Sequence, residues 1–113
     1  MVKEPSHAQL LFGDFAPDLV RLNDELLFGE IWERSGLSKR DRSLITVATL
    51  VALYRTDQIA SHMKRAINNG LTVDELIEAI THIAFYAGWP NAMTAIITAK
   101  ELFGESSIQD SDS

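Results

Sequence analysis

The stretch at residues 42–70, RSLITVATLVALYRTDQIASHMKRAINNG, decides the fold that we predict for this chain. It opens with an apolar run at residues 44–53 that only two threonines interrupt, a pattern typical of a helix buried on most sides. A polar elbow follows at residues 54–58. A second helical pattern then carries His62 and ends at Gly70, a residue that commonly terminates helices. We therefore predict two helices joined at an elbow, and we expect any reactive site to lie there.

Residues suited to helix starts recur along the chain. They are Pro17, Ser38, Thr56, Thr72 and Pro90. Proline fits a first helical turn because its missing N–H has no partner to lose there. Ser38 predicts a helix over residues 39–53, Thr56 predicts a cap for the helix that carries His62, and Thr72 forms a capping box with Glu75.

The pattern of apolar residues indicates an all-α protein, because no stretch alternates apolar and polar residues. The short connections after residue 38 predict helical hairpins. Several helices are apolar on more than one side, and a chain of 113 residues can bury only part of such surface, so we expect a homo-oligomer. We expect a single domain over residues 1–104 and a disordered acidic tail at residues 105–113. An early apolar stripe consists of Phe15, Leu19, Leu22 and Leu26.

Charge and composition exclude several classes of function. The formal net charge of −6 argues against nucleic-acid partners and against binding to anionic membranes. The absence of cysteine excludes disulfides, thiolate metal sites and thiol redox chemistry. The sequence has neither an apolar run long enough for a membrane span nor the apolar core of a secretory signal. We expect a cytoplasmic protein.

His62 is the strongest candidate for a catalytic residue. On a helix it shares a face with Gln58, and Arg55 lies seven residues earlier. A neutral imidazole exchanges protons near physiological pH. The alternative is a histidine that only bonds at a helix interface. For His82, a structural pair with Glu78 is the favoured interpretation, and the histidines are too scattered to predict a metal site.

Three segments together carry a resemblance to a known family. They are FGEIWERSGLSKRDRSLITVATLVAL at residues 28–53, AINNGLTVDELIEAI at residues 66–80 and FYAGWPNAMTAIITAKELF at residues 85–103, with His62 between the first two. In this order and spacing they resemble the carboxymuconolactone decarboxylase family. The resemblance implies an all-α helical-hairpin fold, shared with the alkylhydroperoxidase-D-like proteins, and assembly as trimers or hexamers.

The peroxidase branch of that superfamily uses a C-x-x-C pair before the histidine and a glutamate further upstream. The matching positions here hold Arg55, Gln58 and Ser43. A thiol peroxidase without a thiol cannot run its reaction. A peroxidase-system relative that is inactive as a thiol peroxidase remains a weaker alternative.

The sequence resembles the decarboxylase branch more closely. That resemblance implies loss of CO2 from a small anionic carboxylated lactone, such as γ-carboxymuconolactone, in aromatic-compound degradation. The conjugated carbonyl of such a lactone accepts the electrons, so the reaction needs no cofactor. In this hypothesis His62 donates a proton, Arg55 binds the substrate carboxylate and Gln58 donates a hydrogen bond to the enolate. Glu30 and Trp32, from the matching FGEIW segment, close the pocket.

Two positions depart from the family pattern. Gln58 stands where the decarboxylases tend to have glutamate, and Ala60 stands where they tend to have arginine. The identity of the substrate therefore stays open. A non-catalytic oligomeric protein that binds a small molecule is the alternative function.

Overall fold

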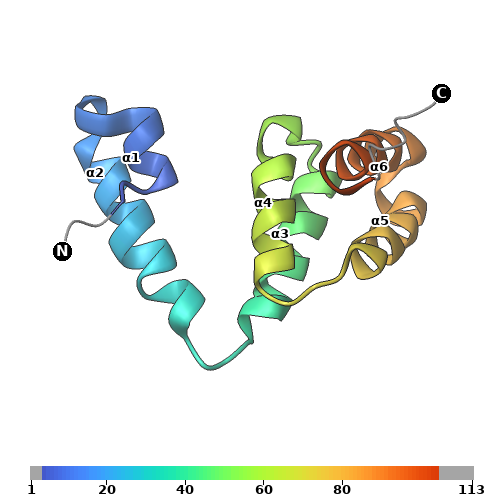
Figure 1. Ribbon diagram of the computed structural model, residues 1–113, viewed down its shortest axis with the longest axis horizontal. Helices are drawn as coiled ribbons and strands as arrows, with labels where there is room; N and C mark the ends of the chain where they lie inside the picture. The colour runs from blue at the N-terminus through green and yellow to red at the C-terminus, as the bar shows by residue number, and fades with distance from the viewer. Residues whose placement is uncertain (1–3, 105–113) are drawn as a thin grey trace. The chain divides into compact units, whose positions relative to one another are not determined.

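The computed structural model describes residues 4–104, and these residues form helices and turns with no strand. The predicted all-α class is confirmed. The chain divides into an N-terminal unit that ends at Lys39 and a C-terminal unit that begins at Arg40 (Figure 1). No helix within residues 4–104 is both long enough and apolar enough to cross a bilayer. The tail expected at residues 105–113 lies outside the described residues.

The N-terminal unit consists of short helical segments. They are α1 (His7–Phe12), η1 (Gly13–Phe15), α2 (Pro17–Arg21), η2 (Leu22–Phe28) and η3 (Ile31–Glu33). Ser6 caps α1 in a capping box with Gln9, and its hydroxyl also donates to Asp24 across 3.0 Å. Pro17 occupies the first turn of α2, as predicted. The chain then widens into the π-helical segment η2, a rare geometry at this length.

The apolar stripe of this unit is exposed. Phe15 is 95% exposed, and Leu19, Leu22 and Leu26 are between 44% and 50% exposed. Large apolar side chains in such a row cost free energy while they face water. This unit therefore carries apolar surface that its own residues leave uncovered.

The C-terminal unit is built from four longer helices. They are α3 (Lys39–Ala52), α4 (Thr56–Asn68), α5 (Val73–Ala87) and α6 (Trp89–Phe103). α3 and α4 run in opposite directions on either side of the elbow (Figure 1), and Asn69 at the end of α4 donates to Ser43 on α3 across 2.9 Å. α6 packs against both α4 and α5.

The core of this unit lies where α6 meets its neighbours. It contains Val47, Val51, Ile59, Met63, Ala66, Leu71, Leu76, Ile80, Ala84, Ala92, Ala95 and Ala99. The buried residues that α6 contributes are all alanine, at three positions spaced three and four residues apart, and Ile96, Leu102 and Phe103 pack against the core while partly exposed. Small side chains on this face let the helix backbones approach closely, so the larger residues of α4 and α5 fill the space.

The end of α4 follows the sequence prediction. Gly70 adopts φ 108°, and its N–H donates to Ile67 O across 3.1 Å. The N–H of Leu71 donates to Ala66 O across 3.0 Å, which completes a Schellman motif. Leu71 and Ala66 are both buried, so the motif also closes the core below the turn.

The end of α3 uses the same motif without glycine. Tyr54 has φ 59°, the one positive φ at a non-glycine position among the described residues. Its N–H donates to Val51 O across 3.1 Å, and the N–H of Arg55 donates to Leu50 O across 2.9 Å. A left-handed conformation costs a residue with a side chain about 1–2 kcal/mol. The elbow is therefore a tight turn held against a backbone preference.

The starts of the two following helices differ from each other. Thr72 and Glu75 form the predicted capping box of α5. The prediction that Thr56 caps α4 is wrong, because the turn ends one residue earlier, at Arg55. The Arg55 carbonyl accepts the N–H of Gln58 across 2.9 Å, which makes Thr56 the first residue inside the helix.

Acid should weaken the link between α3 and α5. The Glu75 carboxylate accepts the Thr72 N–H across 2.9 Å and bonds to Arg40 on α3. First the backbone bond from Thr72 and then the bond from Arg40 lower the pKa of Glu75. The stabilisation is complete above the ordinary glutamate pKa of about 4.3 and is lost as pH falls through the lowered value. We expect wild type to melt above Glu75→Gln at pH 6, with the difference narrowing towards pH 3.

Thermal melts followed by circular dichroism between pH 3 and pH 6 measure this difference. Glu78→Gln, at an exposed position on the same helix, is the control for loss of one negative charge. A melting difference between wild type and Glu75→Gln that stays constant over the whole range would contradict the prediction.

The backbone of Gly70 gives a second prediction. A methyl group added there meets no atom within 4 Å, but φ 108° strains any residue with a side chain. Gly70→Ala should therefore destabilise the protein by about 1 kcal/mol or more and lower its melting temperature. Gly36→Ala is the matched control, because its added methyl also meets nothing and its φ lies outside the strained region. Equal melting temperatures for the two variants would show that the strain is absent.

Candidate functional site

The start of α4 places three of the predicted site residues in succession. Arg55 is the N-cap of α4, Gln58 lies in its first turn, and His62 follows one turn later. Residues four apart lie on one face of a helix, so Gln58 and His62 share a face of α4, and Arg55 lies at the N-terminal end of that helix. His62 is half-buried, and its Nδ1 atom is buried.

The two residues before His62 differ in exposure. Gln58 is half-buried, and its backbone carbonyl accepts the hydroxyl of Ser61 across 3.2 Å. The Arg55 side chain is 59% exposed, and its Nε lies 4.0 Å from Oδ1 of Asp57. Exposed ion pairs contribute little free energy. The Arg55 guanidinium can therefore exchange Asp57 for another carboxylate at small cost.

Glu30 and Trp32 belong to the N-terminal unit. Trp32 is buried and stacks on Phe28, with ring centroids 5.5 Å apart. Glu30 is exposed and pairs with Arg34 across 2.6 Å. The structure thus places Gln58 and His62 four residues apart on α4, with Arg55 at its N-cap, whereas it places Trp32 in the interior of the other unit. The role of Glu30 and Trp32 in closing a pocket stays a prediction.

The structure makes Arg65 a further candidate for anion binding. It lies three residues after His62 on α4 and is half-buried. Burial lowers the pKa of its guanidinium, which remains a cation because arginine keeps its proton in proteins. Arg40, in contrast, bonds to Glu75 and ties α3 to α5. Lys64 is exposed.

Asn91, near the start of α6, contacts the elbow that leads into this site. Its Nδ2 donates to Val51 O across 3.0 Å and to Ala52 O across 3.1 Å. Val51 and Ala52 are the last two residues of α3. Local sequence patterns gave no signal for Asn91, because its partners lie about forty residues earlier in the chain.

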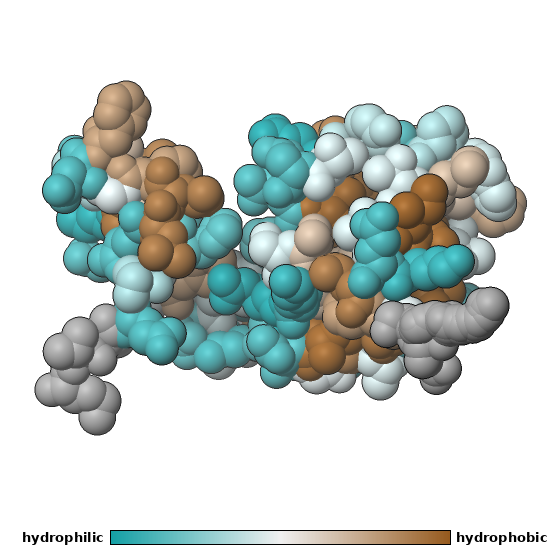
Figure 2. Space-filling model, turned by 45° about the horizontal axis from the view of Figure 1, so that its top comes forward, coloured by the Kyte–Doolittle hydropathy of each residue, from teal (hydrophilic) through white to brown (hydrophobic). Residues whose placement is uncertain are grey.

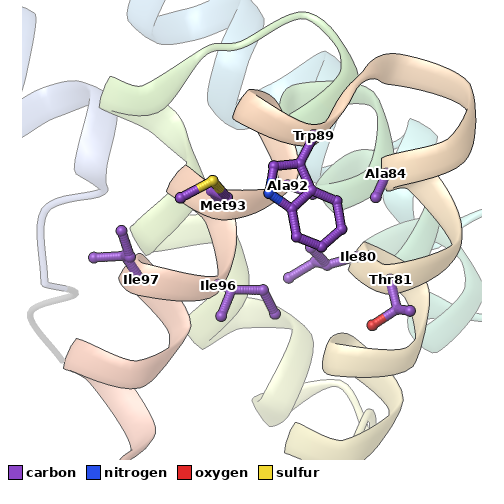
Figure 3. Close-up of a pocket in the computed structure, with 8 residues that line it drawn as sticks. All are labelled: Ile80, Thr81, Ala84, Trp89, Ala92, Met93, Ile96 and Ile97. Carbon is purple, nitrogen blue, oxygen red and sulfur yellow. The ribbon is translucent and has the colours of Figure 1, made fainter.

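An apolar groove lies between α5 and α6, with a volume of about 300 Å³ (Figure 3). It is lined by Ile80, Thr81, Ala84, Trp89, Ala92, Met93, Ile96 and Ile97. Figure 3 shows the Trp89 indole in the middle of these residues, with Ile80, Thr81 and Ala84 on the α5 side. His62 is not part of this lining. The groove is therefore a separate feature of the C-terminal unit and offers almost no polar group for chemistry.

His82, on α5, has a structural environment. Its ring stacks on Tyr86 with centroids 5.0 Å apart. Both residues are exposed. The predicted pair with Glu78 is therefore wrong, because the ring partner of His82 is Tyr86 and no ion pair joins His82 to Glu78 within residues 4–104.

The face of α4 combines three chemical capacities. An imidazole can donate a proton, a carboxamide can donate a hydrogen bond to a developing oxyanion, and a guanidinium can bind a carboxylate. Together these groups suit a reaction in which an anionic substrate gains negative charge on oxygen and then accepts a proton.

Comparison with known proteins agrees with the resemblance read from the sequence. The family model "Carboxymuconolactone decarboxylase family" matches residues 17–101. The chain is 42% identical to the 4-carboxymuconolactone decarboxylase of Acinetobacter baylyi over 90 residues, which are 80% of this chain and 67% of that protein. It is 33% identical to a nitrosuccinic acid decarboxylase of Metarhizium robertsii over 72% of this chain and 57% of that protein.

The family match extends from α2 to the last turns of α6, so it includes the elbow and all three residues on α4. The match over most of the chain and the identity of 42% lead to one conclusion: this chain belongs to the carboxymuconolactone decarboxylase family.

Proposed function

We propose that the protein is a carboxy-lyase that removes CO2 from a small carboxylated lactone or a related acid without a cofactor. The observation that carries the proposal is the succession of Arg55 at the N-cap of α4 with Gln58 and His62 on one face of that helix. The two relatives named as decarboxylases support a reaction of this class. γ-Carboxymuconolactone is the first substrate to test, and its chemistry would place the protein in aromatic-compound degradation.

The proposed step moves one electron pair and one proton. The bond between the carboxylate carbon and the ring breaks, CO2 leaves, and the electron pair enters the conjugated carbonyl as an enolate. Gln58 donates a hydrogen bond to the enolate oxygen, and His62 delivers a proton to carbon. The donor is the imidazolium, so the transfer leaves a neutral imidazole, which takes up a proton from solvent before the next turnover. Because Nδ1 is buried, we assign the transfer to Nε2.

In this proposal, positively charged side chains bind the anionic substrate. Arg55 binds a carboxylate that does not react, and Arg65 adds a second positive charge three residues beyond His62. A formal net charge of −6 repels anions in general, so local cations are needed to hold an anionic substrate. In this proposal Glu30 and Trp32 close the substrate pocket. We also propose that residues 1–104 form a single domain.

We also propose that the chain works as a homo-oligomer, a trimer or hexamer, in the cytoplasm. The support is apolar surface: Figure 2 shows apolar side chains at the surface of each unit. In the groove, Trp89 is 64% exposed, and Met93 and Ile97 are about half exposed. A second copy that covers this groove would remove such side chains from water, at about 25 cal/mol per Å².

Replacement of His62 tests the reaction. Purified protein incubated with γ-carboxymuconolactone should turn it over, followed by absorbance, and His62→Ala should lower kcat by about 10²- to 10⁴-fold because the proton donor is lost. His82→Ala, an exposed histidine on α5, is the matched control and should keep wild-type kcat. Equal activity in wild type and His62→Ala would refute the assignment. Binding of the lactone without turnover by wild type would favour a non-catalytic binding protein.

A charge in the groove tests the oligomer. Ile97→Glu should lower the particle mass measured by light scattering, because a carboxylate cannot be buried there without a partner. Thr49→Glu, at an exposed position on α3, should leave the mass unchanged. A monomeric mass for wild type at micromolar concentration would contradict the proposal.

A further inference from the structure

The elbow between α3 and α4 needs support from outside its own sequence. Gly70 closes α4 without a steric penalty, but Tyr54 holds the equivalent position of α3 at φ 59°. The left-handed conformation is unfavourable for a residue with a side chain, and this preference opposes the Schellman turn. Something else must hold the last turn of α3 in place.

Asn91 supplies two hydrogen bonds at this position. Its amide group has two N–H donors, and the acceptors Val51 O and Ala52 O lie 3.0 and 3.1 Å away. Two carbonyl oxygens within this distance require the NH2 group and would repel the amide oxygen. The last carbonyls of a helix also carry partial negative charge, which favours a donor. Nearby on α6, Thr94 lies 3.4 Å from the Tyr54 hydroxyl.

Arg55 transmits the position of this turn to the candidate site. Its N–H donates to Leu50 O on α3, and its carbonyl accepts the N–H of Gln58 on α4. One residue therefore ends the first helix and begins the second. A shift in the last turn of α3 must move both the Arg55 side chain and the first turn of α4, where Gln58 lies.

We propose that Asn91 is a positioning residue, which sets the elbow and through it the placement of Arg55 and Gln58 against the substrate. It touches no reacting atom. The inference rests on the decarboxylase function proposed above for its kinetic consequence, whereas its structural part can be tested without turnover.

Three substitutions at Asn91 separate the effect of its hydrogen-bond donors from the effect of its side-chain shape. Asn91→Asp keeps the shape but replaces the donor with an acceptor that faces two carbonyl oxygens. Asn91→Ala removes the group, and Asn91→Gln keeps the amide on one more methylene. We expect Asn91→Asp and Asn91→Ala to raise KM and lower kcat, with a loss of about 10- to 100-fold in kcat/KM, because small misplacement of binding groups is costly. The pH at which kcat changes should stay that of wild type, since His62 keeps its place on α4, and Asn91→Gln should recover part of the loss.

Gly70→Ala is the matched control for stability. It loosens the opposite end of α4 and should lower the melting temperature, yet it should leave kcat and KM unchanged. If Asn91 had only a structural role, Asn91→Asp would behave in the same way. A wild-type kcat/KM in Asn91→Asp, measured well below its melting temperature, would therefore overturn the kinetic part of the proposal.

Hydrogen exchange of the elbow decides the structural part. The N–H groups of Tyr54, Arg55 and Gln58 are bonded within the elbow. Exchange measured by mass spectrometry on a peptide that spans residues 53–58 should be faster in Asn91→Asp than in wild type or Gly70→Ala. Unchanged exchange would refute the proposal that the hydrogen bonds of Asn91 hold the elbow in place. Wild-type protein without turnover would contradict the decarboxylase proposal, while the exchange experiment would still decide the role of Asn91 at the elbow.

Discussion

The close packing of α6 against α4 and α5 is the constraint on which the C-terminal unit depends. Ala92, Ala95 and Ala99 present only methyl groups to the core, and the larger residues of α4 and α5 fill the interior. This packing fixes α6 relative to α4, and α4 carries the candidate site. From the start of α6, the short side chain of Asn91 reaches the carbonyls at the end of α3.

The candidate site gains its geometry from backbone hydrogen bonds more than from contacts between its own side chains. Arg55 is held through its N–H and its carbonyl, while its guanidinium faces water beside Asp57. Gln58 and His62 are held by the helix itself. The exposed Arg55 guanidinium can leave Asp57 for a substrate carboxylate at small cost. The proposed chemistry also uses one proton donor and one hydrogen-bond donor and no metal.

The sequence predicts much of the fold because the signals are local. The Thr72 capping box, the Gly70 stop and Pro17 depend on residues within a few positions, and the structure has all three. The predicted cap of α4 lies one residue too late, because threonine commonly caps helices and the local sequence favours Thr56. The turn around Tyr54 is instead decided by bonds from α3 and α6. The grouping of Arg55, Gln58 and His62 follows from helical spacing. Asn91 could not be found in this way, because its partners are distant in sequence.

The groove between α5 and α6 has a consequence for oxidative damage. With no cysteine in the chain, oxidants act first on accessible thioethers. Of the methionines within residues 4–104, Met63 is fully buried, whereas Met93 lines the groove and is about half exposed. Conversion of Met93 to its sulfoxide would place a polar group among apolar neighbours while the imidazole on α4 stayed chemically intact. Peroxide would thus oxidise Met93 in the dissociated chain, where the groove is uncovered, and the sulfoxide would hinder the proposed assembly until methionine sulfoxide reductase restored the thioether.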